Sequence, residues 1–343
     1  MSQPSTDPSD DPTRIRLPEL SPRAYEHAAD RAALTALRKV PGFDAVLRKL
    51  LALVGERSLR LIYLGSAVRV NERQLPRVHA IYRECVDTLG LESAPELYVT
   101  QTPFVNAGAV GVDQPFLVLH SGTLSLLDDD ELRFVLGHEL GHVLSGHVLY
   151  KSMLVILLRL GLVSLRTPVP GLALFAIVTA LEEWDRKSEL SCDRAGLLAC
   201  QSPEAAARAF LKMAGGQHAH EMSVEEFIAQ ADEYEGGGSE LDGVFKILNL
   251  LGTRHPLHVV RLAELRRWIE AGDYERILSG DYPKRTSDPE ASLVSEVVAS
   301  ARSYQERYAT SKDPLVTFVR DLSNDVSTTA NDFVRTFLEQ FGR

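Results

Sequence analysis

Cysteine is scarce in this 343-residue chain, which contains only Cys85, Cys192 and Cys200. An odd, sparse count does not form a disulfide framework and is typical of a reducing compartment. The first residues are acidic and lack the apolar core of a secretory signal, so we expect residues 1–14 to be a disordered tail. Both features predict a cytoplasmic protein, with membrane association as an open alternative.

Positive charge is also in short supply. The chain has 37 Lys and Arg against 47 Asp and Glu, which gives a formal net charge of −10. Nucleic-acid binding usually needs a basic face, so the composition argues against a nucleic-acid partner. The charge gives no reason to expect binding to an anionic membrane surface either.

Long uncharged apolar runs are missing as well. The most hydrophobic stretch, residues 152–181, is broken by Arg159, Arg166 and two prolines, and its longest uncharged run, 167–181, has 15 residues. A membrane-spanning helix needs about 20. We interpret the stretch as two buried helices joined by a turn at 166–170. A hairpin resting on a membrane surface, giving peripheral membrane contact, is the alternative.

The most informative pattern that is present is H-E-x-x-H at residues 138–142. His138 and His142 are four residues apart, so on a helix they face the same side and can reach one metal ion. Glu139 lies beside them. Two imidazoles with an adjacent carboxylate form half of a zinc hydrolase site.

The helix that carries this pattern is expected to run from Asp128 to about Tyr150. Its acidic first residues are predicted to cap free N–H groups rather than to bind metal. Three glycines lie within it: Gly137, Gly141 and Gly146. Each costs ~1 kcal/mol relative to alanine, so we expect another element to pack closely there. His147 points about 140° away from His142 on a regular helix, which predicts a core or supporting histidine rather than a ligand.

A later helix, expected over Glu182–Cys200, carries Glu189 and Asp193 one turn apart on one face. Taken alone, the pair would be two solvated acids. Because two histidines leave a zinc site one ligand short, Glu189 is a candidate third ligand. Asp193 could then accept a hydrogen bond from the outer nitrogen of a ligand histidine.

Four short motifs follow one another along the chain: Asn106-Ala107, His138-Glu139-x-x-His142, Glu189-x-x-x-Asp193 and His255-Pro256-x-x-x-x-Arg261. In this order they resemble the gluzincin zinc metallopeptidases that include the CAAX prenyl proteases and the heat-shock protease HtpX. The resemblance covers about residues 67–269. It implies an α+β, mainly α fold, with a small sheet beside the H-E-x-x-H helix. We expect strands at 67–70, 96–100, 104–111 and 115–120.

The resemblance also implies a zinc endopeptidase that cleaves proteins or peptides with one Zn²⁺ per chain. Three residues would bind the metal: His138, His142 and Glu189. Glu139 would act as the general base, and His255 would stabilise the oxyanion with Arg261 as support. The strand at Asn106 and Ala107 would hold the substrate backbone, and Arg261 would also take part in substrate binding.

The chain departs from the family pattern in two places. Cys192 stands directly before Asp193, where the family usually has alanine, and the 152–181 segment is shorter than the family's spanning helices. We therefore expect a soluble branch and do not transfer prenyl-protease specificity. The competing interpretation is a catalytically weak zinc-binding scaffold that acts through its C-terminal helices or at a membrane surface.

The predicted organisation has four parts. The tail (1–14) is followed by an N-terminal helical layer (15–66), in which no residue suggests chemistry. The metallopeptidase domain (67–283) comes next, and amphipathic helices (284–343) end the chain. These C-terminal helices are predicted to dock on the protein's own surface, with binding to a partner or to a second copy as alternatives.

Overall fold

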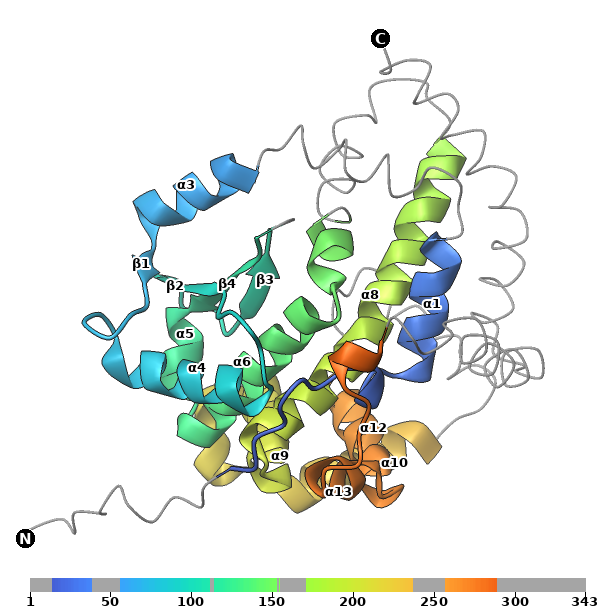
Figure 1. Ribbon diagram of the computed structural model, residues 1–343. Coiled ribbons are helices and arrows are strands. Elements are labelled where there is room, and N and C mark those ends of the chain that lie inside the picture. Colours follow the sequence, from blue (N-terminus) through green and yellow to red (C-terminus); the bar gives the residue numbers. More distant parts are fainter. Residues whose placement is uncertain are drawn as a thin grey trace, which may run out of the picture.

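The computed structural model describes residues 14–38, 56–111, 114–152, 154, 171–236 and 257–288. Helices dominate, and one small sheet lies beside the central helices (Figure 1). The predicted α+β, mainly helical fold is therefore confirmed. The C-terminal helices predicted beyond residue 288 lie outside the described residues, as does the predicted turn at 166–170.

The sheet has four strands in the order β1-β2-β4-β3. They are β1 (Val68–Arg69), β2 (Glu96–Thr100), β3 (Ala107–Val110) and β4 (Phe116–His120). β2 and β4 are parallel, and the two outer pairs are antiparallel. Side chains alternate between the faces, so Leu97 and Leu117 enter the main core while Tyr98 and Phe116 face the other side. There Tyr63 of α3 (Glu56–Ser66) packs against Phe116, with ring centroids 5.2 Å apart.

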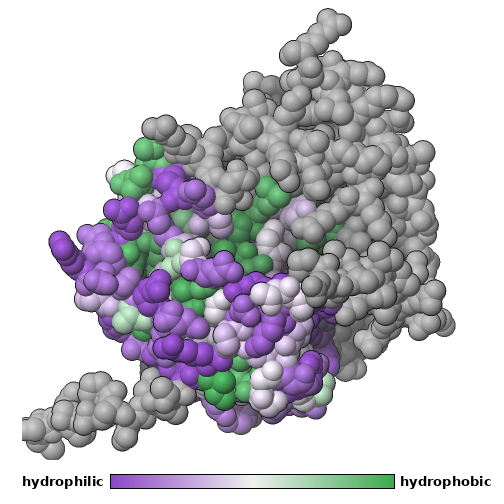
Figure 2. Space-filling view, in the orientation of Figure 1, coloured by the Kyte–Doolittle hydropathy of each residue, from purple (hydrophilic) through white to green (hydrophobic). Residues whose placement is uncertain are grey.

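The outer surface of α3 is apolar. Leu61, Ile62 and Leu64 are all exposed, and Figure 2 shows hydrophobic residues gathered over this helix. Hydrophilic residues cover most of the remaining visible part of the described surface. No helix among the described ranges combines the length and hydrophobicity that crossing a membrane requires.

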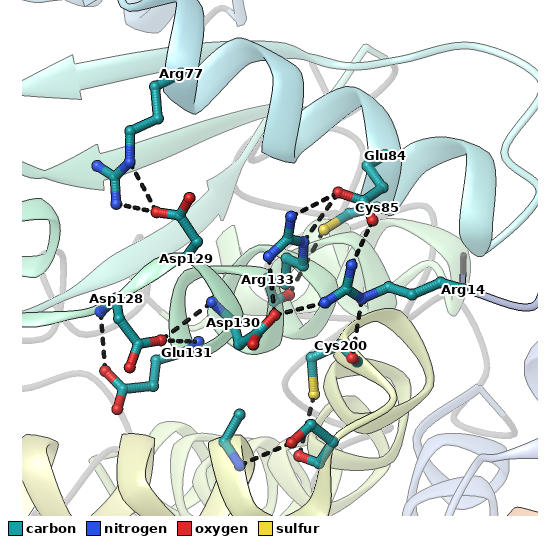
Figure 3. A network of polar contacts seen from close by, with 12 residues as sticks. Arg14, Arg77, Glu84, Cys85, Asp128, Asp129, Asp130, Glu131, Arg133 and Cys200 are labelled. Atoms are coloured by element: carbon teal, nitrogen blue, oxygen red, sulfur yellow. Dashed lines mark hydrogen bonds and ion pairs between the residues drawn. The ribbon is translucent and has the colours of Figure 1, made fainter. Parts of the chain in front are cut away.

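The central helix, α6 (Asp129–Leu144), begins with a capping box. The Asp128 carboxylate accepts the N–H groups of Asp130 and Glu131, at 3.1 and 3.0 Å, and Glu131 Oε2 accepts the N–H of Asp128 at 2.9 Å. These reciprocal bonds satisfy orphan donors of the first turn, and they confirm the predicted cap. Figure 3 shows this start of the helix, where Arg77 also pairs with Asp129.

The end of α6 differs from the prediction. The helix stops at Leu144, and Gly146 adopts a left-handed conformation with φ of 69°. Such a glycine commonly terminates a helix. Residues 147–152 are again helical, so His147 belongs to a new segment rather than to a continuation of α6.

Close packing between α6 and α8 (Gly171–Cys200) forms the centre of the molecule. A Cβ on Gly137 would lie 2.3 Å from the Cβ of Ala199, and a Cβ on Gly141 would lie 2.7 Å from that of Ala195. The predicted close approach is therefore confirmed for both glycines. The helix predicted from Glu182 is the second part of α8, which begins at Gly171.

The N-terminal segment is held against the same core. Arg14 contacts Glu84 of α4 (Pro76–Thr88) at 2.7 Å, Asp130 of α6, and the carbonyl of Cys200 at the end of α8 (Figure 3). Leu17 and Leu20 are fully buried in the main core. After the short helix η1 (Pro22–Ala24), α1 (Ala28–Arg38) lies alongside α8 (Figure 1).

The remaining elements complete the helical layer around α6 and α8. They are α5 (Ser121–Leu126), α9 (Pro203–Gly215), η2 (Gly216–Glu221), α10 (Val224–Gly236), α12 (His258–Glu270), α13 (Asp273–Leu278) and η3 (Arg285–Ser287). The last of these returns to the N-terminal segment, because the N–H of Arg285 donates to the carbonyl of Glu19 at 2.9 Å.

Candidate metal centre

Three side chains converge where α6 crosses α8. His138 and His142 come from α6, and Glu189 comes from α8. The two Nε2 atoms are 3.2 Å apart, and Glu189 oxygens lie 3.5 Å from His138 Nε2 and 3.2 Å from His142 Nε2. All three residues are buried, with Glu189 only 1% exposed. The sequence-predicted ligand set is thus brought together in one place.

These donor atoms fit a single metal ion. A tetrahedral zinc ion with bonds of about 2.0–2.1 Å to nitrogen and oxygen has ligand atoms about 3.3–3.4 Å apart. The two imidazole nitrogens are 3.2 Å apart, close to this value, and each has a Glu189 oxygen nearby: Oε1 lies 3.2 Å from His142 Nε2 and Oε2 lies 3.5 Å from His138 Nε2. Two imidazoles and one carboxylate also form a donor set used by catalytic zinc, in which a fourth position is left for water or substrate.

Asp193 and Arg261 support the outer side of His138. His138 Nδ1 lies 3.0 Å from Asp193 Oδ1, and Arg261 Nε donates to Asp193 Oδ2 at 2.8 Å. Burial alone would raise the pKa of Asp193, but the charge and hydrogen bonds of Arg261 hold it below its usual range. The Arg261 guanidinium also lies over the Phe210 ring, 5.1 Å from its centroid. The carboxylate is therefore ionised and fixed in place.

The two histidines differ in proton affinity. Burial lowers the pKa of His138, but hydrogen bonds to Asp193 and Glu189 outweigh it and raise this pKa to about 9. Burial lowers the pKa of His142, and the charge of Lys151 lowers it further. His142 is therefore a neutral imidazole, as metal ligation requires, whereas at His138 a proton competes with a metal ion.

His142 is supported by a different set of residues. Its Nδ1 lies 3.2 Å from His147 Nδ1, and His147 Nε2 lies 3.2 Å from Asp30 Oδ2 of α1. His147 is fully buried, as the sequence predicted. Cys192 Sγ lies 3.6 Å from His147 Nδ1. Hence His142, His147 and Cys192 form a second group of potential metal donors that shares His142 with the first.

Lys151 and Asp185 adjoin the centre and were not singled out by sequence reasoning. Lys151 Nζ lies 2.7 Å from Glu189 Oε1, 2.9 Å from Asp185 Oδ1 and 3.5 Å from His142 Nε2. Burial opposes the ammonium, but Asp185 and Glu189 raise the pKa of Lys151 above its usual value. The charge of Glu139, 7% exposed, acts in the same direction. A lysine at the edge of an apolar stretch was the available signal.

Ala107 begins β3, an outer strand of the described sheet against which α6 packs, and Asn106 directly precedes this strand. The Asn106 carbonyl accepts the N–H of His120 at 3.0 Å. Bonded and non-bonded positions alternate along an antiparallel pair, so the backbone groups of Ala107 and Ala109 face away from β4. Asn106 itself is exposed. An outward-facing strand edge of this kind can pair with an extended peptide.

Comparison with known families decides the identity of the chain. The model of peptidase family M48 matches residues 72–269, more than half of the sequence. The chain belongs to peptidase family M48. Its relatives include the "Plastoglobule-localized metallopeptidase 48, chloroplastic" of Arabidopsis thaliana, which is 33% identical over 271 residues, 76% of this chain and 77% of that protein.

Shorter matches connect this M48 peptidase to HtpX. A "Protease HtpX homolog" of Kineococcus radiotolerans is 41% identical over 86 residues, 24% of this chain and 29% of that protein. The homolog of Helicobacter pylori is 35% identical over 69 residues, 20% and 22% of the two chains. These alignments span less than a third of the HtpX proteins. No solved structure gives a significant match.

Family membership makes the chain a metallopeptidase, so it takes a divalent metal ion and acts on proteins or peptides. The matched range contains every site residue predicted from the sequence, but Asp30 precedes it. His255 lies outside the described residues, and α12 begins three residues later at His258. Arg261 of α12 contacts Asp193, which favours a role through that carboxylate; substrate binding by Arg261 stays a prediction.

Proposed function

We propose that this M48 peptidase is a zinc-dependent endopeptidase whose metal is held by His138, His142 and Glu189. The observation that carries the proposal is the buried cluster of their donor atoms: the two imidazole nitrogens are 3.2 Å apart and the Glu189 carboxylate lies within 3.2–3.5 Å of both, a donor set that suits zinc. The strand edge at β3 supports the endopeptidase assignment. A strand edge recognises peptide backbone, which occurs throughout a chain, rather than the charged groups at its ends.

Glu139 is the proposed general base. Zinc at this centre would lower the pKa of a water molecule toward ~7 and polarise the peptide carbonyl. Glu139 accepts the proton of that water and then delivers it to the leaving amine. Three observations support this role: Glu139 directly follows a ligand histidine on α6, it is buried, and its charge acts on Lys151, which adjoins the centre.

The other site residues act on the substrate or on the ligands. Asn106 and Ala107 align the substrate backbone along β3, and Asp193 fixes the ring of His138. His255 donates a hydrogen bond to the oxyanion. His255→Ala should therefore lower kcat more than it raises KM. The reverse pattern in steady-state kinetics would make His255 a substrate-binding residue instead.

Glu139→Gln tests the chemistry. The amide cannot accept the proton, so cleavage of a casein-type substrate should fall by about 10²–10⁴-fold while one zinc per chain is retained. Glu92→Gln, at an exposed glutamate outside the centre, is the matched control and should keep full activity. Undiminished cleavage by Glu139→Gln would remove Glu139 as the base. Absence of cleavage by the wild-type protein would favour the scaffold interpretation.

Quenched peptides distinguish an endopeptidase from an exopeptidase. Peptides blocked at both ends should be cleaved at internal bonds as fast as their unblocked forms. Cleavage confined to peptides with a free terminus would overturn the endopeptidase assignment and leave the metal site intact. The cytoplasmic location and the peripheral membrane contact through residues 152–181 stay predictions, and co-sedimentation of the full chain with liposomes tests the second.

A further inference from the structure

The two ligand histidines have outer nitrogens with different surroundings. His138 Nδ1 faces the Asp193 carboxylate, the usual kind of partner for a ligand histidine. His142 Nδ1 faces a second imidazole, that of His147, at 3.2 Å. An imidazole can serve as the acceptor only if its facing nitrogen carries no proton, so the position of the protons along this path matters.

The contacts of the two rings continue from His142 to a carboxylate. With Nε2 of His142 directed at the metal ligands, Nδ1 carries the proton and donates it to His147 Nδ1. The other ring nitrogen of His147, Nε2, lies 3.2 Å from Asp30 Oδ2, within ion-pair distance of this carboxylate. A continuous path of contacts therefore connects the Asp30 carboxylate, the His147 ring and His142 Nδ1.

Both carboxylate oxygens of Asp30 accept hydrogen bonds. Trp184 Nε1 donates to Oδ1 at 2.9 Å, and Ser191 Oγ donates to Oδ2 at 2.6 Å. Both donors belong to α8, the helix that also carries Glu189. Asp30 is 1% exposed, and burying a carboxylate costs more than burying a packed apolar residue would. A buried carboxylate of this kind is expected where its charge interacts favourably with another buried group.

We propose that Asp30 and His147 position His142 for metal binding, so that helix α1, which precedes the family-matched range, completes the metal centre. The inference rests on the proposed zinc site. Asp30 is a positioning residue because it acts only through His147. Through Asp30, the N-terminal helix α1 is thus linked to the histidines of the H-E-x-x-H pattern.

A rival arrangement shares His142 and His147 with the proposed path and adds Cys192. His142, His147 and Cys192 could themselves hold the metal, because their donor atoms also cluster. Two observations disfavour it. The rival set leaves His138, which is held by Asp193 and Arg261, outside the centre. In addition, burial raises the pKa of the Cys192 thiol well above its usual value, which opposes the thiolate that a metal needs.

Zinc affinity of the full-length protein, measured by competition with a chelating indicator after metal stripping, tests the proposal. Asp30→Asn keeps the shape and removes the charge, and His147→Phe removes the acceptor while keeping a ring against Trp184. Each should weaken zinc binding by about 10–100-fold. His147→Asn keeps an acceptor near the Nδ1 position and should recover part of the loss. Cys192→Ala, which touches His147 from outside the path, is the matched control and should bind zinc like the wild type.

The outcomes separate the alternatives. Wild-type zinc affinity in both Asp30→Asn and His147→Phe overturns the positioning role, even if their melting temperatures in EDTA are lower, because that result describes packing alone. Loss of zinc in Cys192→Ala but not in Glu189→Ala favours the rival site. A wild-type protein that binds no zinc contradicts the proposed function itself, and the positioning role with it.

Discussion

The residues that hold the outer nitrogens of His138 and His142 come from different parts of the chain. His138 is fixed by Asp193 and Arg261, which lie within the family-matched range and belong to two of the sequence motifs. His142 contacts His147, which in turn contacts Asp30 on a helix that docks from the N-terminal side of that range. One side is a buried ion pair, and the other is an imidazole between a ligand and a carboxylate.

This difference shows that the two histidines of one short motif can depend on different parts of the chain. The Asp193 side forms as soon as α6, α8 and α12 pack together. The Asp30 side needs the N-terminal segment to be docked as well, which depends on Arg14, Leu17 and Leu20 reaching their places. We therefore expect the His142 side to respond to changes in the N-terminal segment to which the His138 side is insensitive.

The largest effect should come from the ion pair. Arg261→Ala leaves Asp193 buried without its cation, and removal of one partner of a buried pair typically costs about 3–5 kcal/mol. Urea denaturation of the metal-free protein measures this loss. Arg266→Ala on the same helix is the control, because its ion pairs with Asp232 and Glu270 are 3.6–3.7 Å long and partly exposed, and should cost at most about 1 kcal/mol. Equal effects would mean that Asp193 is not held by Arg261.

Zinc binding should depend on pH through one histidine. The pKa of His138 is raised to about 9 and that of His142 is lowered, so at neutral pH zinc displaces one proton, from His138. Affinity should rise about tenfold per pH unit up to about pH 9 and then level off, because His138 is neutral above that pH. Chelator competition across pH 6–10 measures the slope. A slope of two protons would mean that His142 is also protonated in the metal-free protein, and would contradict the neutral state assigned to His142.

Parts of the centre with local sequence signals were predictable. The four-residue spacing of His138 and His142, the acidic cap at Asp128 and the glycines of α6 each follow from one helix and its immediate packing. Asp185 and Asp30 carry no such signal, and Lys151 offers only its place beside an apolar stretch, because the importance of all three arises only when distant segments meet. The end of α6 at Leu144 was missed because glycine marks both close packing and helix termination, and a Cβ added at Gly146 would meet nothing within 4 Å.

A smaller effect is expected at the contact between α6 and α8, the two helices that hold the metal ligands. Alanine is the better helix residue, but at Gly137 its Cβ would lie 2.3 Å from Ala199 Cβ, so Gly137→Ala should lower the unfolding free energy by about 1–3 kcal/mol. Gly65→Ala in α3 has nothing within 4 Å and should be neutral or stabilising by up to ~1 kcal/mol. Thermal denaturation compares the two. The same sign for both would show that the helices can separate at little cost.

The smallest effect concerns His27, which precedes α1. Its backbone N–H donates to Ser191 Oγ at 2.8 Å, close to Asp30. Burial lowers the pKa of its imidazole to about 3, and the nearby Arg194 adds to the shift. The unfolded chain therefore binds the proton more readily, so stability is full above about pH 6.5 and is lost as pH falls from 6.5 toward 3.

His27→Gln should remove part of this acid sensitivity. We expect the melting temperature of the metal-free variant to fall by about 2–3 °C less than that of the wild type between pH 7 and pH 5, since ~1 kcal/mol corresponds to ~1–2 °C for a chain of 343 residues. Zinc affinity at pH 5, corrected for the protonation of His138, should also be preserved better in the variant, because α1 and Asp30 stay docked. Identical acid profiles would show that the N-terminal layer does not open before the rest of the molecule, and would remove the expected difference between the two sides of the centre.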